Sequence, residues 1–258
     1  MSRAVGPLRI GLLYPELLGT YGDRGNAEVL AWRARRRDLA AEVVEVPASA
    51  PVPTGLDAYL LGGGEDAAQA TVAELLRSPA GDGLRRAVAE DRVVLAVCGA
   101  YQLLGRGYSD AAGRRTDGLG LLDVETRSAL PRLVGEVVVR TGEGELLTGF
   151  ENHGGRTWLG PGMEPLGRVL RGCGNNQDDG VEGVRRGALI GTYLHGPVVA
   201  RNPFLADLLL RAMLLRRGAV RPVLAPLAED RSRALHDARL AATLARRPHR
   251  RTVRARAR

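Results

Sequence analysis

The sequence predicts an α/β fold: a mainly parallel sheet with helices on both faces and some antiparallel strands. Strand-like apolar runs alternate with helix-length segments from residue 8 to residue 107, which is the pattern of parallel βαβ units. Several of these runs are apolar at nearly every position, as strands buried on both faces are. From residue 118 onward, glycine-rich turns join the strand-like runs, which favours antiparallel pairs.

The first half of the chain begins with a buried strand at 8–15 (LRIGLLYP) and a polar loop, GTYGDRGN. A helix follows at 27–39, on which we expect Val29, Leu30 and Trp32 to face inward. The remaining elements of this half are strands at 41–46, 58–64 and 92–98 and helices at 67–77, 82–90 and 99–107.

The second half contributes strands at 118–127, 132–140, 163–171 and 187–196, and a final amphipathic helix at 202–217 that covers the sheet. Asn202 stands at the N-cap position of this helix and Pro203 at its first position. Residues 218–258 have few large apolar side chains. We therefore divide the chain into one domain at 8–217 and an arginine-rich, largely disordered tail at 218–258, in which part of 228–246 is suited to a weak helix.

The net charge of +8 lies entirely in this tail. The tail has eleven arginines against Glu229, Asp230 and Asp237, and the rest of the chain is balanced. The charge therefore says little about the chemistry of the domain. We do not expect a nucleic-acid partner, because the tail has no aromatic residue for base stacking. Weak contact with a membrane surface is the alternative expectation for the tail.

Two sequence features bear on location. No apolar stretch reaches the ~18 residues of a membrane span, and the N-terminus lacks the cleavage region of a signal peptide. The two cysteines, Cys98 and Cys173, make neither a disulfide framework nor a metal-ligand spacing. We expect a cytoplasmic protein without a metal site.

Cys98 occupies a sharp corner between an apolar strand and a helix, in VVLAVCGAYQLLG. Such a corner lifts a nucleophile out of the sheet and leaves backbone N–H groups pointing at it. Its neighbours Ala96, Gly99 and Ala100 are small enough for the turn, and the helix start is expected to lower the thiol pKa below roughly 8.5. The local sequence fits a buried structural cysteine equally well. Cys173 has no such context.

A nucleophilic cysteine needs a base, and His195 is the favoured candidate. It follows a core strand, so we expect it at the same carboxyl edge of the sheet as Cys98. His153 lies in a glycine loop and is the weaker candidate, while His236 and His249 fall in the tail.

An oxyanion hole needs backbone N–H groups that can approach a developing negative charge. The glycine triplet of LLGGGED follows another strand and offers such a backbone. Its Gly63 and Gly64, with Gly99 after the cysteine, are the candidate donors. A glycine triplet alone also fits an ordinary turn.

Together these motifs resemble the class I glutamine amidotransferases. A GGG loop, the corner CGAYQLLG and the later YLHG match that family in order, and a histidine followed by glycine is typical of its cobyric acid synthase-like branch. Within the branch, YGDRGN, GGGEDAAQ, RLVGEVVV, FENHGGRT and YLHGPVVARNPFLADLLL resemble the glutaminase subunits of lipid II isoglutaminyl synthases. The resemblance covers about residues 8–217 and implies the class I amidotransferase-like (flavodoxin-like) three-layer fold.

The resemblance implies an enzyme that hydrolyses L-glutamine and passes on the ammonia. The implied partner in a heterodimer is a Mur-ligase-like synthetase subunit, which uses ATP and Mg²⁺ to amidate the D-glutamate α-carboxyl of lipid II to D-isoglutamine. No cofactor is implied in this chain. By motif, Cys98 is the nucleophile that forms a glutamyl thioester, and His195 is the base. Arg132 is implied to hold the substrate α-carboxylate, and Gln102 is a second substrate-binding candidate.

This chain departs from the wider family at one position. Most class I enzymes orient the histidine with a glutamate two residues later, and Pro197 stands there instead. One hypothesis is that a carboxylate of the partner subunit completes the triad on docking. Glu65 or Asp66 of this chain is the alternative, and both are equally at home as loop or helix-cap residues.

Two rival functions stay open on the sequence alone. The same glutaminase could serve the amidation of a corrinoid precursor or another carboxylate, although such relatives usually carry the synthetase domain in the same chain. The second rival is a non-catalytic α/β scaffold with a basic nucleic-acid-binding arm.

Overall fold

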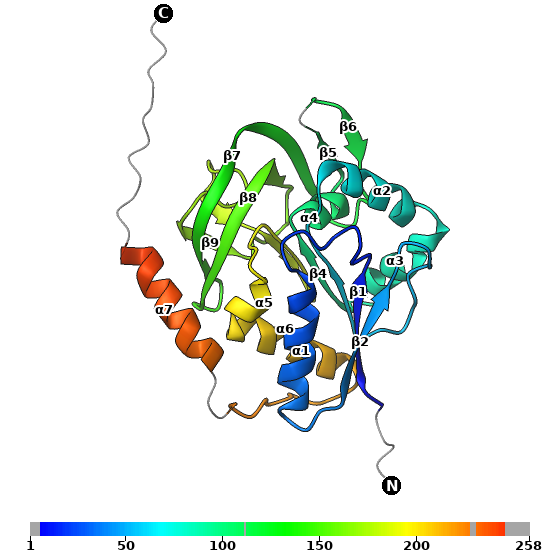
Figure 1. The fold of residues 1–258 in the computed structure, drawn as a ribbon, viewed down its shortest axis with the longest axis vertical. Coiled ribbons are helices and arrows are strands. Elements are labelled where there is room, and N and C mark those ends of the chain that lie inside the picture. Colours follow the sequence, from blue (N-terminus) through cyan, green and yellow to red (C-terminus); the bar gives the residue numbers. More distant parts are fainter. Residues whose placement is uncertain (1–5, 111, 228–230, 246–258) are drawn as a thin grey trace, which may run out of the picture.

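The computed structural model describes residues 6–110, 112–227 and 231–245. Its central sheet, sheet A, has the strand order β11-β12-β4-β3-β1-β2 (Figure 1). Every neighbouring pair in it is parallel except β11–β12 at one edge, which confirms the predicted mainly parallel sheet. The strands of sheet A are β1 (Leu8–Leu13), β2 (Ala41–Val46), β3 (Ala58–Leu61), β4 (Val93–Val97), β11 (Val184–Arg186) and β12 (Leu189–Thr192).

Helices cover both faces of sheet A, as predicted (Figure 1). One group of helices packs together on one face: α1 (Arg24–Arg35), α5 (Val198–Arg201) and α6 (Pro203–Arg216). The other group consists of α2 (Asp66–Arg77), the 3-10 turn η1 (Pro79–Gly81), α3 (Asp82–Ala89) and α4 (Gly99–Leu104). The three-layer α/β fold is therefore confirmed.

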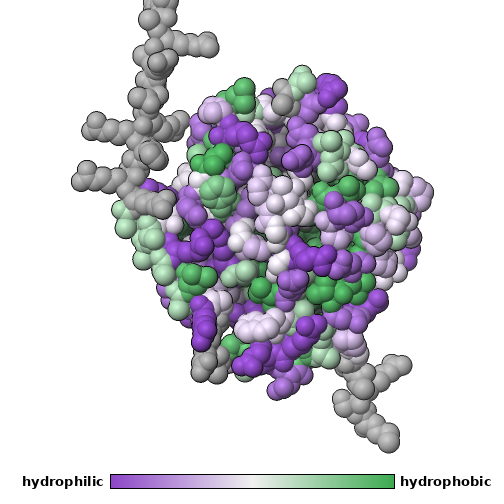
Figure 2. Space-filling view, in the orientation of Figure 1, coloured by the Kyte–Doolittle hydropathy of each residue, from purple (hydrophilic) through white to green (hydrophobic). Residues whose placement is uncertain are grey.

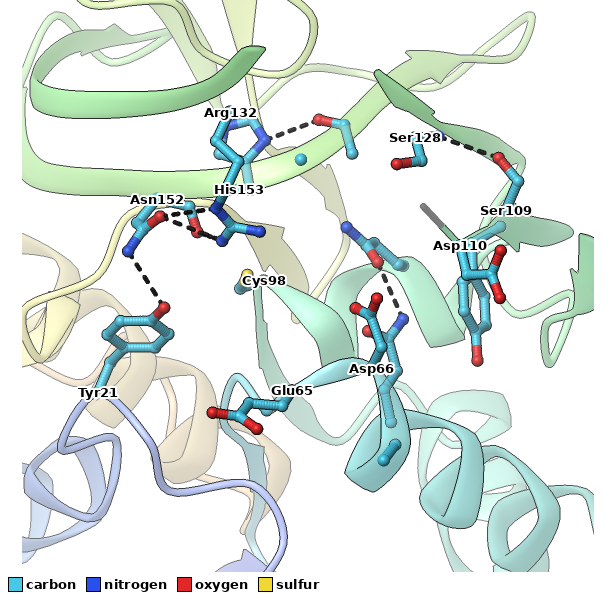
Figure 3. Close-up of a pocket in the computed structure, with 17 residues that line it drawn as sticks. Tyr21, Glu65, Asp66, Cys98, Ser109, Asp110, Ser128, Arg132, Asn152 and His153 are labelled. Atoms are coloured by element: carbon cyan, nitrogen blue, oxygen red, sulfur yellow. Dashed lines mark hydrogen bonds between the residues drawn. The ribbon is translucent and has the colours of Figure 1, made fainter. Parts of the chain in front are cut away.

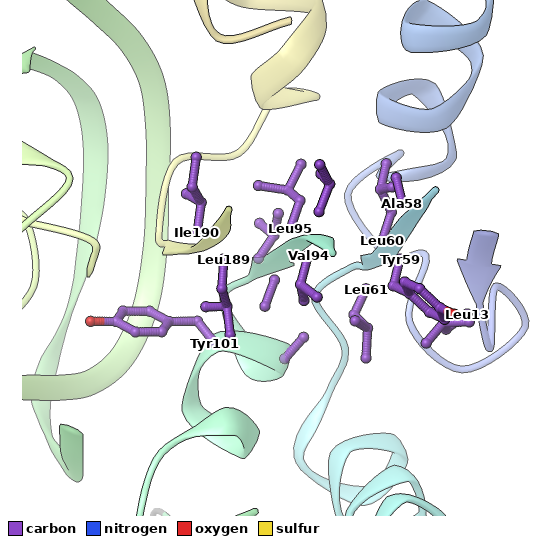
Figure 4. Close-up of a cluster of buried hydrophobic side chains, with 14 of the residues drawn as sticks. Leu13, Ala58, Tyr59, Leu60, Leu61, Val94, Leu95, Tyr101, Leu189 and Ile190 are labelled. Atoms are coloured by element: carbon purple, nitrogen blue, oxygen red, sulfur yellow. The ribbon is translucent and has the colours of Figure 1, made fainter. Parts of the chain in front are cut away.

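The strands of sheet A are apolar because helices bury both of their faces. Leu60, Leu95 and Ile190 lie on three neighbouring strands and are buried in one cluster (Figure 4). Burying each such side chain stabilises the fold by roughly 1.5–3 kcal/mol. Gly191 interrupts the apolar pattern of β12 for a steric reason: a Cβ there would lie 2.3 Å from the ring of Tyr101 on α4.

The antiparallel strands of the second half mostly form a separate sheet B rather than extending sheet A. Its order is β10-β9-β7-β5-β6, with β8 paired to β7. A long hairpin of β7 and β8 dominates it (Figure 1). The strands of sheet B are β5 (Gly107–Ser109), β6 (Arg115–Asp117), β7 (Val124–Thr141), β8 (Leu146–Leu159), β9 (Gly167–Arg171) and β10 (Val181–Glu182).

Two local predictions for the helices need correction. Leu30 is buried on α1, but Trp32 is 48% exposed and Val29 only partly buried, because α1 packs through Leu30 and small alanines. Asn202 does occupy the N-cap position of α6, yet its side chain makes no cap hydrogen bond. Its amide instead bonds the backbone of Thr148 on β8 in both directions, at 2.8 Å each.

The tail contains one described helix, α7 (Arg231–Ala245), where a weak helix was expected. It packs beside β7, β8, α5 and α6. The Nδ1 of His236 lies 2.9 Å from the carbonyl oxygen of Arg201 on α5. The prediction of disorder for 228–230 and 246–258 lies outside the described residues. In the described part of the chain, no helix is long and apolar enough to cross a membrane.

Candidate active site

Three loops meet at the carboxyl edge of sheet A. β3, β4 and β12 are neighbouring parallel strands, so the loops that follow them leave the sheet at the same edge. These loops carry the glycine triplet, Cys98 and His195, respectively. The sequence-based placement of Cys98 and His195 on one edge therefore agrees with the structure.

Cys98 sits on a strained corner. Its φ of 53° and ψ of −108° lie outside the regions that non-glycine residues favour. The corner is fixed on both sides, because the Cys98 N–H donates to the carbonyl of Thr192 at 2.8 Å and its own carbonyl accepts from Gln102 at 3.1 Å. Backbone strain of this kind is typical of the nucleophile elbow between a strand and a helix.

His195 is held by its backbone and by the packing of its ring. Its N–H and carbonyl both bond the backbone of Phe150 on β8. The ring of Tyr21 lies against the imidazole, with 4.3 Å between ring centroids. A Cβ on Gly63 would lie 3.1 Å from Cε1 of His195 and 3.3 Å from Cβ of Cys98. Both side chains therefore border the same small space beside the glycine loop.

A cavity of about 550 Å³ opens above Cys98 (Figure 3). Arg132 and Asn152 of sheet B border it, and so do Gln102 of α4 and Gly64. It is large enough to admit a small polar molecule such as an amino acid. The other lining residues are Tyr21, Glu65, Asp66, Ala67, Gln69, Tyr108, Ser109, Asp110, Ser128, His153, Gly154 and Gly155.

Arg132 is oriented toward the cavity by Asn152. The Nε and Nη2 of Arg132 each donate to Oδ1 of Asn152 at 3.1 Å, and Nη2 also donates to its backbone carbonyl at 2.9 Å. Asn152 in turn donates from Nδ2 to the hydroxyl of Tyr21 at 3.2 Å. Figure 3 shows Tyr21, Asn152 and Arg132 in a row beside Cys98.

Gln102 lies in a buried hydrogen-bond network. Its Oε1 accepts from Gln69 at 2.9 Å, and its Nε2 donates to the hydroxyl of Tyr193 at 3.1 Å. Because both polar atoms already have protein partners, Gln102 shapes the wall of the cavity. Each of the two polar atoms can form one more hydrogen bond, so the substrate-binding role of Gln102 stays a prediction.

The three candidate oxyanion donors differ in availability. The N–H of Gly63 already donates to Oδ2 of Asp23 at 2.8 Å. The backbones of Gly64 and Gly99 approach each other, since a Cβ on Gly99 would lie 3.5 Å from the nitrogen of Gly64. The geometry therefore favours Gly64 and Gly99 as donors, with Gly63 held by Asp23.

The catalytic candidates are both uncharged at neutral pH. Burial, and then the negative charge of Asp23, raise the pKa of Cys98 to about 12. The lowered pKa expected from the helix start is therefore wrong for this structure: the N–H of Gly99 and the charge of Arg132 act downward but do not offset burial. Burial, followed by the charge of Arg132, lowers the pKa of His195 to about 4. A neutral imidazole beside a neutral thiol can act as a base only as the thiol attacks.

The remaining candidates have clear places. His153 lines the cavity with its ring stacked on Tyr193, and burial is the main cause that lowers its pKa to about 3. Glu65 and Asp66 also border the cavity. Neither is hydrogen-bonded to His195, whose two ring nitrogens have no hydrogen-bond partner among residues 6–110, 112–227 and 231–245.

Sequence reasoning missed Tyr21, Asp23 and Asn152. The first two stand in GTYGDRGN, in the connection between the carboxyl end of β1 and the start of α1, and this position was the available signal. Cys173 is not among the residues that line the cavity. In the same described ranges, no group of three or more His, Cys, Asp or Glu is placed to hold a metal ion.

A comparison of the sequence with protein families identifies the family of this chain. The CobB/CobQ-like glutamine amidotransferase domain matches residues 9–203, a span that contains Cys98, Arg132 and His195. The chain is a member of this amidotransferase family. The resemblance inferred from the sequence motifs is therefore confirmed at the level of the family.

Two curated relatives are similar over most of their length. "Lipid II isoglutaminyl synthase (glutamine-hydrolyzing) subunit GatD" of Staphylococcus aureus is 38% identical over 78% of this chain and 82% of its own. The protein of the same name from Streptococcus pneumoniae is 36% identical over 81% of this chain and 82% of its own. The solved structure of PurLQS from Thermotoga maritima matches with a TM-score of 0.53 at 14% identity, covering 82% of this chain and 99% of that one. This last likeness shows the fold alone.

Proposed function

We propose that this amidotransferase hydrolyses L-glutamine at Cys98 and delivers the ammonia to a separate Mur-ligase-like subunit. That subunit would use ATP and Mg²⁺ to amidate the D-glutamate α-carboxyl of lipid II to D-isoglutamine, in the cytoplasm. The single observation that supports the glutaminase step is Cys98 on a strained corner beside His195, at the floor of a cavity bordered by Arg132. The acceptor is proposed from the two GatD relatives.

The proposed reaction begins with substrate orientation. Arg132 receives the α-carboxylate of glutamine, with Asn152 holding the guanidinium in place. His195 takes the thiol proton as Cys98 attacks the side-chain amide carbon, and the N–H groups of Gly64 and Gly99 stabilise the tetrahedral oxyanion. The protonated imidazole then gives its proton to the leaving ammonia, and water hydrolyses the glutamyl thioester.

The third catalytic group stays a hypothesis. Since no described carboxylate bonds His195, a carboxylate from the partner subunit is our proposed source. The Tyr21 ring covers the imidazole, so this carboxylate would have to reach His195 past Tyr21. The hypothesis predicts low glutaminase activity for the isolated chain and a large increase in the complex. Comparable rates for the two would contradict it.

The test is co-expression with the Mur-ligase-like subunit, followed by amidation of lipid II with glutamine or with ammonium chloride. Cys98→Ala should abolish glutamine use and keep ammonia use. The matched control Cys173→Ala replaces a cysteine outside the cavity and should keep both activities. Loss of both activities in Cys98→Ala would point to a structural role for this cysteine. Amidation of a corrinoid precursor but not of lipid II would identify the other acceptor.

A further inference from the structure

The segment Tyr21–Asn26, YGDRGN, spans the end of the loop before α1 and the first residues of α1. It contacts His195, Asn152 and the glycine triplet of the candidate active site. Tyr21 packs on the ring of His195 and accepts from Asn152, which orients Arg132. Asp23, only 2% exposed, bonds the N–H of Gly63. The catalytic steps proposed above assign no role to this segment, although it lies at the same sheet edge as Cys98.

The glycine triplet packs directly on Asp23. A Cβ on Gly62 would lie 2.7 Å from Oδ2 of Asp23 and 2.3 Å from the carbonyl oxygen of Leu18. No residue larger than glycine therefore fits at position 62, next to the Asp23 carboxylate. The position of the triplet, and with it the direction of the Gly64 N–H, therefore depends on Asp23.

The C-terminal half of Tyr21–Asn26, which forms the first turn of α1, contacts the residues that follow His195. Oδ1 of Asn26 accepts the N–H of Val199 on α5 at 2.9 Å, in a buried position. A Cβ on Gly25 would lie 2.6 Å from the ring of Pro197. Pro197 occupies the position at which most class I enzymes have a glutamate, so in this chain the segment Tyr21–Asn26 packs against both His195 and the residues that follow it.

We propose that Tyr21 and Asp23 are positioning residues: Asp23 fixes the glycine loop that supplies an oxyanion donor, and Tyr21 joins His195 to Arg132 through Asn152. This inference rests on the proposed glutaminase function and adds two residues to it. Two separate kinetic effects follow. Asp23 acts through the oxyanion donor, so its loss should change kcat. Tyr21 also acts through Asn152 on Arg132, so its loss should change KM as well.

The experiment measures glutaminase kcat and KM for the full chain in complex with its synthetase subunit. Asp23→Ala should lower kcat about tenfold or more with little change in KM. Asp23→Asn keeps an oxygen that can accept from Gly63 and should recover most of kcat. Tyr21→Phe removes only the hydroxyl bonded to Asn152, so it should raise KM severalfold with kcat nearly unchanged. Tyr21→Ala also removes the ring from His195 and should lower kcat too.

Three outcomes would overturn the proposal: equal losses in Asp23→Ala and Asp23→Asn, an unchanged KM in Tyr21→Phe, or full activity in Asp23→Ala. If Asp23→Ala does not fold, the kinetic comparison is replaced by a measurement of amide hydrogen exchange at Gly63 in the wild type and in Asp23→Asn, which reports whether the N–H bond to residue 23 is present. Protection in both supports the proposal, and rapid exchange in the wild type contradicts it. A wild-type complex without any glutaminase activity would instead refute the proposed function, and the exchange measurement would still test the role of Asp23.

Discussion

At the scale of single residues, the candidate site pairs a neutral thiol on a strained backbone corner with a neutral imidazole. Burial keeps the Cys98 thiol protonated and the His195 imidazole deprotonated. Such a thiol reacts slowly with general electrophiles in the resting protein, since the thiolate is the nucleophilic form. Proton transfer then depends on a substrate that supplies new contacts as the thiol attacks. The rate of this proton transfer should therefore be sensitive to the space around Cys98 and His195.

Gly63→Ala tests that space. The added Cβ would stand 3.1 Å from His195 and 3.3 Å from Cys98, so one of the two must shift by a few tenths of an ångström. We expect kcat for glutamine to fall about tenfold or more, while the melting temperature changes by less than about 2 °C. The control is Gly142→Ala, where nothing lies within 4 Å of the added carbon. Undiminished activity in Gly63→Ala would contradict the assigned geometry.

Asp23→Asn also tests the electrostatics of the thiol. The Asp23 carboxylate raises the pKa of Cys98, so its neutral replacement should lower that pKa and speed alkylation by iodoacetamide. Burial raises the pKa of Asp23 itself to about 6. The difference in alkylation rate between the variant and the wild type should therefore reach its maximum well above pH 6. It should vanish well below pH 6, where Asp23 is already protonated.

The control for this alkylation measurement is Asp66→Asn. Asp66 raises the pKa of Cys98 through the smallest of the identified causes, so its replacement should speed alkylation less than Asp23→Asn does. An equal effect of the two variants, or slower alkylation in Asp23→Asn, would show that Asp23 does not set the thiol pKa.

At the scale of helices and strands, local patterns predicted most of the parallel sheet, and long-range packing explains what they missed. The corner at Cys98 is visible in sequence because strand, small residues and helix are contiguous. Trp32 could not be placed, because its exposure depends on which face of α1 meets α6. Asp23 and Asn152 act through partners far along the chain, Gly63 and Arg132, and no local spacing reveals such pairs.

Helix α7 provides an element-scale prediction. Leu240 is partly buried and borders a cavity of about 300 Å³ between α7 and the body, whereas Leu244 is 45% exposed. Leu240→Ala should lower the free energy of unfolding by roughly 1–2 kcal/mol, less than a fully buried leucine would. Leu244→Ala, the matched control, should stay within about 0.5 kcal/mol of the wild type. Chemical denaturation measures both, and equal effects would mean that α7 does not dock as described.

At the scale of the whole molecule, the candidate site lies where the two sheets meet. Cys98 and His195 come from sheet A, while Arg132 and Asn152 come from the long hairpin of sheet B. The backbone bridge between His195 and Phe150 joins the two sheets at that point. In the proposed function, substrate recognition and bond breaking fall to different sheets, so relative movement of the sheets would change KM and kcat together.

On the face seen in Figure 2, hydrophobic residues are interspersed with hydrophilic ones.

The uneven charge of the whole chain leads to a last prediction. The final thirteen residues contain seven arginines and no acidic residue, and residues 1–217 together carry no net charge. Each arginine near an anionic membrane contributes about 1 kcal/mol, and salt screens this attraction. We therefore expect the full chain to sediment with vesicles containing anionic lipid at low salt and to be released at about 0.5 M salt. A chain ending at Ala245 should not sediment and should keep its glutaminase activity. Equal sedimentation of both chains, or a stronger preference for RNA over the vesicles, would show that the tail serves another partner.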